Sequence, residues 1–129
     1  MENRYTKQAR EALDAAEVYA KELKHPYIGT EHLLMGLRTS ISGVAAQVLE
    51  MNGLREEDVR KVVGELVSRV GDEPFSGRPK ESPRLKFILE EGRKMAERFR
   101  MSEVGTEHLL LAIVRDTDCV AARILITLN

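Results

Sequence analysis

A carboxylate and a histidine stand side by side twice in this sequence, in two identical copies of Gly-Thr-Glu-His-Leu-Leu. The copies run from Gly29 to Leu34 and from Gly105 to Leu110, so that Glu31 precedes His32 and Glu107 precedes His108. An acid beside a histidine could serve acid–base catalysis or contribute to a metal site. The duplication raises the question of whether an active site or a binding site has been copied.

A catalytic or metal site needs partners that this sequence does not supply. There is no HExxH motif, no paired CxxC, no glycine-rich phosphate loop and no GxSxG elbow. The third histidine, His25, corresponds to Met101 in the second copy, and Cys119 is expected to be a small apolar residue at a tight packing point. We therefore predict no catalytic residues, no metal and no cofactor, and we expect His32 and His108 to point into the packing between the two copies.

Glu31 and Glu107 leave two interpretations open. Each follows a threonine at the start of an expected helix, where the helix dipole favours an acid by roughly 0.3–1 kcal/mol. Alternatively, each carboxylate lines a small surface pocket and pairs with a cationic ligand, above all a guanidinium, through two parallel hydrogen bonds.

The two motifs belong to a longer internal repeat. When residues 6–53 are aligned without gaps on residues 82–129, at an offset of 76 positions, twelve of the 48 pairs are identical. The identities include Val44-Ala-Ala46 with Val120-Ala-Ala122, which we interpret as contact points between helices. We predict one domain over residues 1–129, with a first repeat at 1–70, a linker at 71–81, and a second repeat at 82–129 that stops before its last helix.

Each repeat has the pattern of short helices. Apolar residues recur every three or four positions from Ala9 to Leu23, after Thr6 as a cap, and again after Ser82-Pro83. Thr30 and Thr106 are expected to cap the second helix of their own repeats. Further helices are expected from about Ser42 to Met51, ending at Asn52-Gly53, and from Val59 to Val70. The predicted fold is all-α, a pseudo-twofold bundle of about seven to eight helices.

Composition narrows the classes of function. The chain is 43% hydrophobic and 32% charged with a formal net charge of −1, which indicates a soluble globular protein with no general attraction to nucleic acid or membranes. No stretch approaches the roughly 20 apolar residues of a membrane span, and the first residues lack an apolar signal segment. The single cysteine and the missing signal favour a cytoplasmic location.

These motifs together resemble a known family. His25-Pro-Tyr-Ile-Gly-Thr-Glu-His-Leu-Leu34 followed by Gly43-Val-Ala-Ala46, repeated after a Ser-Pro-Arg start, is similar to the Clp N-terminal repeat domain, in particular that of ClpC-type Hsp100/AAA+ unfoldases. The resemblance implies a pseudo-twofold bundle of about eight helices that receives substrates and MecA-type adaptors. ATP hydrolysis and the proteolytic ClpP partner would then belong to other parts of a parent protein.

The resemblance also implies a ligand. Domains of ClpC proteins bind phosphorylated arginine at two equivalent sites, and by motif these correspond to Glu31 with Thr6 and to Glu107 with Ser82. The carboxylate would hold the guanidinium, and the helix N-terminus with its hydroxyl would meet the phosphate. The alternative function is a free-standing Clp-repeat interaction protein that regulates without an ATPase of its own.

Overall fold

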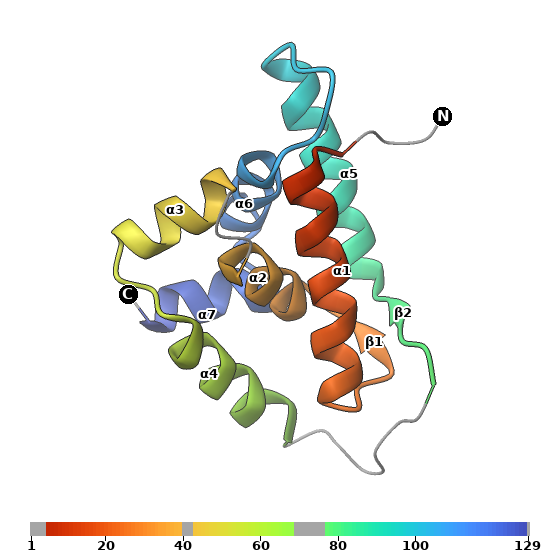
Figure 1. The fold of residues 1–129 in the computed structure, drawn as a ribbon, viewed down its shortest axis with the longest axis vertical. Helices are drawn as coiled ribbons and strands as arrows, with labels where there is room; N and C mark the ends of the chain where they lie inside the picture. The colour runs from red at the N-terminus through yellow and green to blue at the C-terminus, as the bar shows by residue number, and fades with distance from the viewer. Residues whose placement is uncertain (1–4, 40–42, 69–76, 129) are drawn as a thin grey trace.

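The computed structural model of the chain describes residues 5–39, 43–68 and 77–128. These residues form seven helices and two strands of two residues each, as Figure 1 shows. The helices are α1 Lys7–Glu22, α2 Thr30–Thr39, α3 Val44–Met51, α4 Glu56–Ser68, α5 Pro83–Arg98, α6 Thr106–Arg115 and α7 Val120–Leu128; the strands are β1 Tyr27–Ile28 and β2 Lys80–Glu81. The predicted all-α class is confirmed, with the two short strands as an unpredicted addition.

The first helix of each repeat begins as its sequence predicts. The Thr6 hydroxyl oxygen accepts a hydrogen bond from the Ala9 N–H at 3.1 Å, and the Ser82 hydroxyl oxygen accepts one from the Leu85 N–H at 3.1 Å. Pro83 is the first residue of α5, where its missing N–H removes no helical hydrogen bond. Both predicted caps are therefore confirmed.

The next two helices of the first repeat also match the pattern. Helix α3 begins at Val44 and ends before Asn52-Gly53. Gly53 has a φ of 80°, a backbone conformation that would be strained for a residue with a side chain. Helix α4 covers the predicted valine pattern as far as Ser68. The outer ends of these two predictions, Ser42 and Val70, lie outside the described residues.

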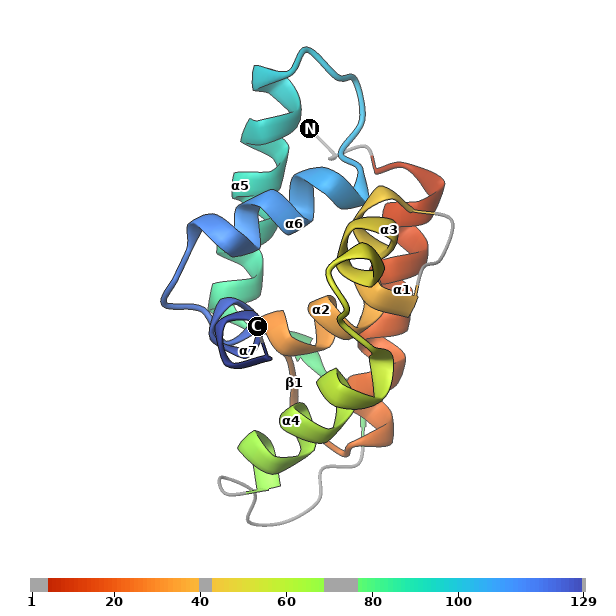
Figure 2. The same ribbon diagram turned by 90° about the vertical axis from the view of Figure 1, so that its left-hand side faces the viewer.

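Helices α1 and α2 pack closely because their contact faces carry small residues. Ala9, Ala12, Ala16 and Ala20 are all fully buried along one face of α1. Gly36 of α2 lies so near that a Cβ there would clash with the carbonyl oxygen of Ala12. The core around this contact is aliphatic, and α2 runs through the centre of the bundle in Figures 1 and 2.

The two repeats exchange equivalent backbone contacts. In the parallel pair β1–β2, Ile28 lies beside Glu81, and an isolated parallel bridge joins Val104 to Tyr5. These are the same contact shifted by 76 positions, so a twofold relation carries one repeat onto the other.

Residues 71–76 of the predicted linker lie outside the described residues, whereas its end at 80–81 forms β2. The boundaries of the repeats stay predictions.

The threonines of the repeated motif cap helices in the opposite repeat, not their own. The Thr30 hydroxyl oxygen accepts the Ala121 N–H of α7 at 3.1 Å, and the Thr106 hydroxyl oxygen accepts the Ala45 N–H of α3 at 3.1 Å. The prediction that they cap α2 and α6 is therefore wrong, because each threonine is already the first helical residue and its side chain is buried between the repeats.

Removing these two hydroxyls should destabilise the fold with little change of shape. Thr30→Val and Thr106→Val keep the volume but leave a buried N–H without its acceptor, so we expect each to lower the free energy of unfolding by about 1–2 kcal/mol. Urea denaturation followed by circular dichroism measures the change. The matched controls Thr30→Ser and Thr106→Ser retain the hydroxyl and should lose less; equal losses for valine and serine would contradict the capping role.

Candidate functional site

The repeated glutamates lie back over the glycines of their own motifs. Glu31 and Glu107 occupy the first turns of α2 and α6. A Cβ on Gly29 would clash with the Glu31 carboxylate, and a Cβ on Gly105 would clash with that of Glu107. The carboxylate therefore folds back against the glycine at the helix start, into space that a side chain on that residue would share. Both glutamates are half-buried.

The glutamate carboxylates have no cationic partner within the described part of the chain. The ion pairs of that part join other residues, and neither Glu31 nor Glu107 takes part in one. Burial raises the pKa of Glu31, an effect opposed by a hydrogen bond from its own backbone N–H. A desolvated carboxylate without a counter-ion is suited to receive a cation from outside.

The repeated histidines hold the backbone of the motif. The Gly29 N–H donates to Nδ1 of His32 at 2.8 Å, and the Gly105 N–H donates to Nδ1 of His108 at 2.8 Å. Each histidine is the third residue of its helix and satisfies a backbone donor just outside it. The predicted buried position of both histidines is confirmed, and the sequence did not reveal this capping contact.

The first repeat adds a second histidine. Because Nδ1 of His32 accepts a hydrogen bond, its Nε2 carries the proton and donates to Nδ1 of His25 at 2.8 Å. Burial lowers the pKa of His32 to about 4, with a further contribution from His25, and burial also lowers the pKa of His25. Both rings are therefore neutral near pH 7.

The structure joins the predicted site residues across the repeats, not within them. The Thr6 N–H donates to the carbonyl of Val104 at 2.9 Å, and the Ser82 N–H donates to the carbonyl of Ile28 at 3.0 Å. Thr6 therefore lies beside the motif that holds Glu107, and Ser82 beside the one that holds Glu31. These contacts favour pairing Thr6 with Glu107 and Ser82 with Glu31 over the expected pairing of Thr6 with Glu31 and of Ser82 with Glu107.

The length of the first helix explains the exchange. Helix α1 has 16 residues and spans about 24 Å, which separates Thr6 at its start from the turn that leads into β1 and α2. In Figures 1 and 2 the start of α1 lies near the start of α6, while β1 lies at the other end of α1. The sequence alone does not show whether each hydroxyl meets the glutamate of its own repeat or that of the other repeat. A shift of 76 positions maps Thr6 onto Ser82 and Glu31 onto Glu107 in either case.

Two candidate sites result, and each brings together a carboxylate and a helix N-terminus: Glu107 with the start of α1, and Glu31 with the start of α5. The hydroxyl oxygens of Thr6 and Ser82 accept from their own helices, which leaves the hydroxyl hydrogen available to donate to a ligand. The first N–H groups of a helix have no partner within it and attract anions. The arrangement can therefore bind a ligand that carries both a cationic and an anionic group.

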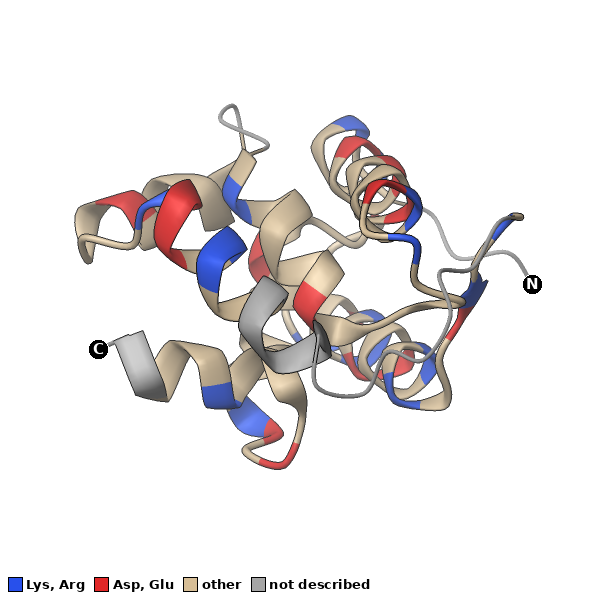
Figure 3. Cartoon of the chain, turned by 90° about the horizontal axis from the view of Figure 1, so that it is seen from below, with Lys and Arg blue, Asp and Glu red and all other residues tan. Residues whose placement is uncertain are grey.

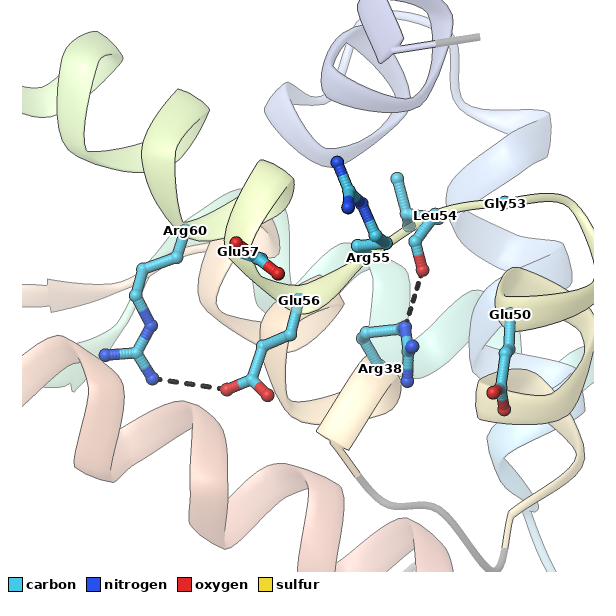
Figure 4. Close-up of a pocket in the computed structure, with 8 residues that line it drawn as sticks. All are labelled: Arg38, Glu50, Gly53, Leu54, Arg55, Glu56, Glu57 and Arg60. Atoms are coloured by element: carbon cyan, nitrogen blue, oxygen red, sulfur yellow. Dashed lines mark hydrogen bonds and ion pairs between the residues drawn. The ribbon is translucent and has the colours of Figure 1, made fainter.

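A separate pocket of about 540 Å³ contains none of the predicted site residues. It is lined by Arg38, Glu50, Gly53, Leu54, Arg55, Glu56, Glu57 and Arg60, between the ends of α2 and α3 and the start of α4 (Figure 4). Within it, Arg38 Nε donates to the Leu54 carbonyl at 2.7 Å and Arg60 pairs with Glu56 at 3.2 Å. Three arginines and three glutamates line the pocket, so it offers a ligand no charge of one sign. Basic and acidic residues are likewise mixed along the helices in Figure 3.

Two further classes of site find no support in the part of the chain that the structure describes. No group of three or more histidine, cysteine, aspartate or glutamate side chains there could hold a metal ion. None of the described helices is long and apolar enough to cross a membrane.

Cys119 is buried, and its sulfur accepts the Ala122 N–H at 3.4 Å and thereby caps α7. Burial raises the pKa of its thiol.

The buried His32 predicts a pH dependence of stability. Its folded pKa of about 4 lies below the ordinary 6.5, so the unfolded chain binds the proton more readily and acid favours unfolding. We expect stability to be intact above about pH 6.5 and to fall by roughly 3 kcal/mol as the pH drops towards 4.

The measurement is the free energy of unfolding in urea between pH 7 and pH 4, compared with His32→Asn. Asparagine can still accept the Gly29 N–H but does not titrate, so the difference between the two proteins isolates the histidine. Parallel pH profiles for the two would contradict this account.

Comparison with known proteins finds one matching family and relatives of similar sequence. The family described as the Clp repeat (R) N-terminal domain matches residues 4–128. The negative regulator of genetic competence ClpC/MecB of Bacillus subtilis (strain 168) is 40% identical over 125 residues. The ATP-dependent Clp protease ATP-binding subunit ClpC of Staphylococcus aureus (strain USA300) is 38% identical over 130 residues. The alignments cover 97% and 98% of this chain but only 15% of each relative.

Solved structures agree on the fold. The N-domain of ClpV from Vibrio cholerae superposes with a TM-score of 0.79 at 24% identity, over 97% of this chain and 75% of that one. A ClpV N-domain in complex with a VipB peptide gives 0.77 at 23% identity, over 97% and 76%. From the family match and the ClpC relatives, the chain belongs to the Clp repeat (R) N-terminal domain family and is homologous to the N-domain of ClpC.

Proposed function

We propose that this chain is the substrate- and adaptor-docking domain of a ClpC-type unfoldase and binds proteins marked by phosphorylated arginine at two sites. One site combines Glu31 with Ser82, and the other combines Glu107 with Thr6. The observation that carries the proposal is a half-buried carboxylate without a cationic partner beside the N-terminus of a helix from the other repeat, formed twice.

The chemistry of the mark fits this arrangement. Phosphoarginine presents a planar guanidinium joined directly to an anionic phosphate. The carboxylate accepts the guanidinium through charge-assisted hydrogen bonds, and the hydroxyl hydrogen and the first N–H groups of the helix receive the phosphate. Unmodified arginine would lack the second interaction and free phosphate the first, so each should bind more weakly.

The relatives support the wider role. A ClpV N-domain of the same fold is in complex with a peptide, which shows that this fold can receive a segment of another protein. The ClpC relative from Staphylococcus aureus is described as the ATP-binding subunit of a protease, and this chain spans about 15% of its length. We infer that ATP hydrolysis and contact with the ClpP protease belong to the remainder of such a parent protein, and that this domain selects what is presented to it. Two sites on one domain would raise the avidity for multiply marked substrates.

Calorimetric titration with free phosphoarginine tests the proposal. We expect saturable binding at two sites, which Glu31→Ala together with Glu107→Ala abolishes while circular dichroism shows an unchanged fold. Each lost charge-assisted contact should cost about 1.5–3 kcal/mol. Titrations with arginine and with phosphate serve as ligand controls, and Glu103→Ala, an exposed acid near the second motif, as the protein control. Unchanged binding in the double variant would refute the site assignment.

A second experiment tests the exchange between repeats. Thr6→Asp keeps an N-cap residue and so should leave α1 stable, but its carboxylate repels the phosphate. We expect Thr6→Asp to abolish the Glu107 site alone, so that calorimetry finds one site instead of two.

The double variants decide the pairing. Thr6→Asp with Glu107→Ala should still bind one phosphoarginine, whereas Thr6→Asp with Glu31→Ala should bind none. The reverse result would show that each site lies within one repeat after all.

A further inference from the structure

Two exposed apolar side chains in the turn before the Glu107 motif have no exposed apolar equivalents at the matching positions of the first repeat. Phe99 and Met101, in the turn after α5, are 59% and 52% exposed. The equivalent residues of the first repeat are Leu23, which packs against the core, and His25, which binds His32. The exposed apolar pair is therefore a local departure from the twofold relation.

A chain of contacts connects this pair to the carboxylate. The Phe99 ring stacks on His108, with ring centroids 6.1 Å apart and planes inclined by 25°. His108 accepts the Gly105 N–H, and the Glu107 carboxylate lies against that same glycine. Phe99 thus lies next to the Glu107 site on its own repeat, with Met101 two residues further along the turn.

The neighbourhood of the Glu31 site is more polar. There, Nδ1 of His25 is bound to His32, and the exposed ring on β1, Tyr27, carries a hydroxyl. In the second repeat the position of Tyr27 is taken by Glu103. The two sites therefore share the residues proposed to hold the mark but differ in what surrounds them.

We propose that Phe99 and Met101 extend the Glu107 site, so that it selects arginine marks flanked by apolar side chains. This inference rests on the proposed function. The occupant is an extended segment of a substrate protein whose marked arginine lies on Glu107 and Thr6 and whose neighbouring apolar residue lies on Phe99 and Met101. Such segments are buried in folded proteins and exposed in unfolded ones, so the site would join recognition of the mark to recognition of unfolding.

Two peptides that differ only beside the mark test this selection. Each carries one phosphoarginine, flanked by leucine in one peptide and by serine in the other, and the protein carries Glu31→Ala so that only the Glu107 site remains. We expect the leucine peptide to bind about tenfold more tightly, because apolar surface is buried on the pair. In the converse background, Glu107→Ala, the two peptides should bind with similar affinity.

Variants of the apolar pair provide the decisive comparison. Met101→Ser with Phe99→Ser should abolish the preference for leucine, Phe99→Leu should retain it, and Met51→Ala, an 86% exposed methionine on α3, should not affect it. Free phosphoarginine should bind equally to all these proteins, which also shows that the fold and the charged part of the site survive.

The possible outcomes separate the two hypotheses. Binding of free phosphoarginine without a preference between the peptides, or a preference that survives Phe99→Ser with Met101→Ser, overturns the inference and leaves the proposed function standing. Absence of any phosphoarginine binding to the unaltered chain overturns the proposed function and the inference with it.

Discussion

The hydrogen bonds that the motif threonines accept from the opposite repeat are the constraint on which this structure depends. Thr30 and Thr106 are buried, and each accepts a backbone N–H from the helix that opens with Val-Ala-Ala in the other repeat. Burying those helix starts without an acceptor would cost free energy at the centre of the bundle. Because each threonine precedes a site glutamate, the bond that joins the repeats also fixes the position of both carboxylates.

This constraint explains why six residues are repeated without change. The glycine leaves room for the carboxylate, the threonine caps a helix of the other repeat, and the histidine accepts the glycine N–H. The two leucines are buried in the core. Only the glutamate has no partner among the described side chains, so five of the six residues have a structural contact and the glutamate is the candidate for binding a ligand.

Local features could be predicted from the sequence, and contacts between the repeats could not. Thr6 and Ser82 cap the helices that follow them because that signal is contained within four residues. Thr30 has the same local signature, but its hydroxyl is turned towards α7 by tertiary packing. The strands β1 and β2 are two residues long, too short to show alternation, yet they are what places Ser82 beside the motif of Glu31.

The twofold relation makes the two sites alike in position but not in chemistry. At the Glu107 site the helix begins with Lys7, which supplies both an N–H and a positive charge near an incoming phosphate. At the Glu31 site the helix begins with Pro83, which has no N–H, and Arg84 follows it with a positive charge that pairs with Asp116 at 3.0 Å. The N–H that Pro83 lacks is the clear difference between the two helix starts, and one missing charge-assisted hydrogen bond is of the order of 1.5–3 kcal/mol. The phosphate should therefore be held more firmly at the site of Glu107 and Thr6, the same site that the apolar pair borders.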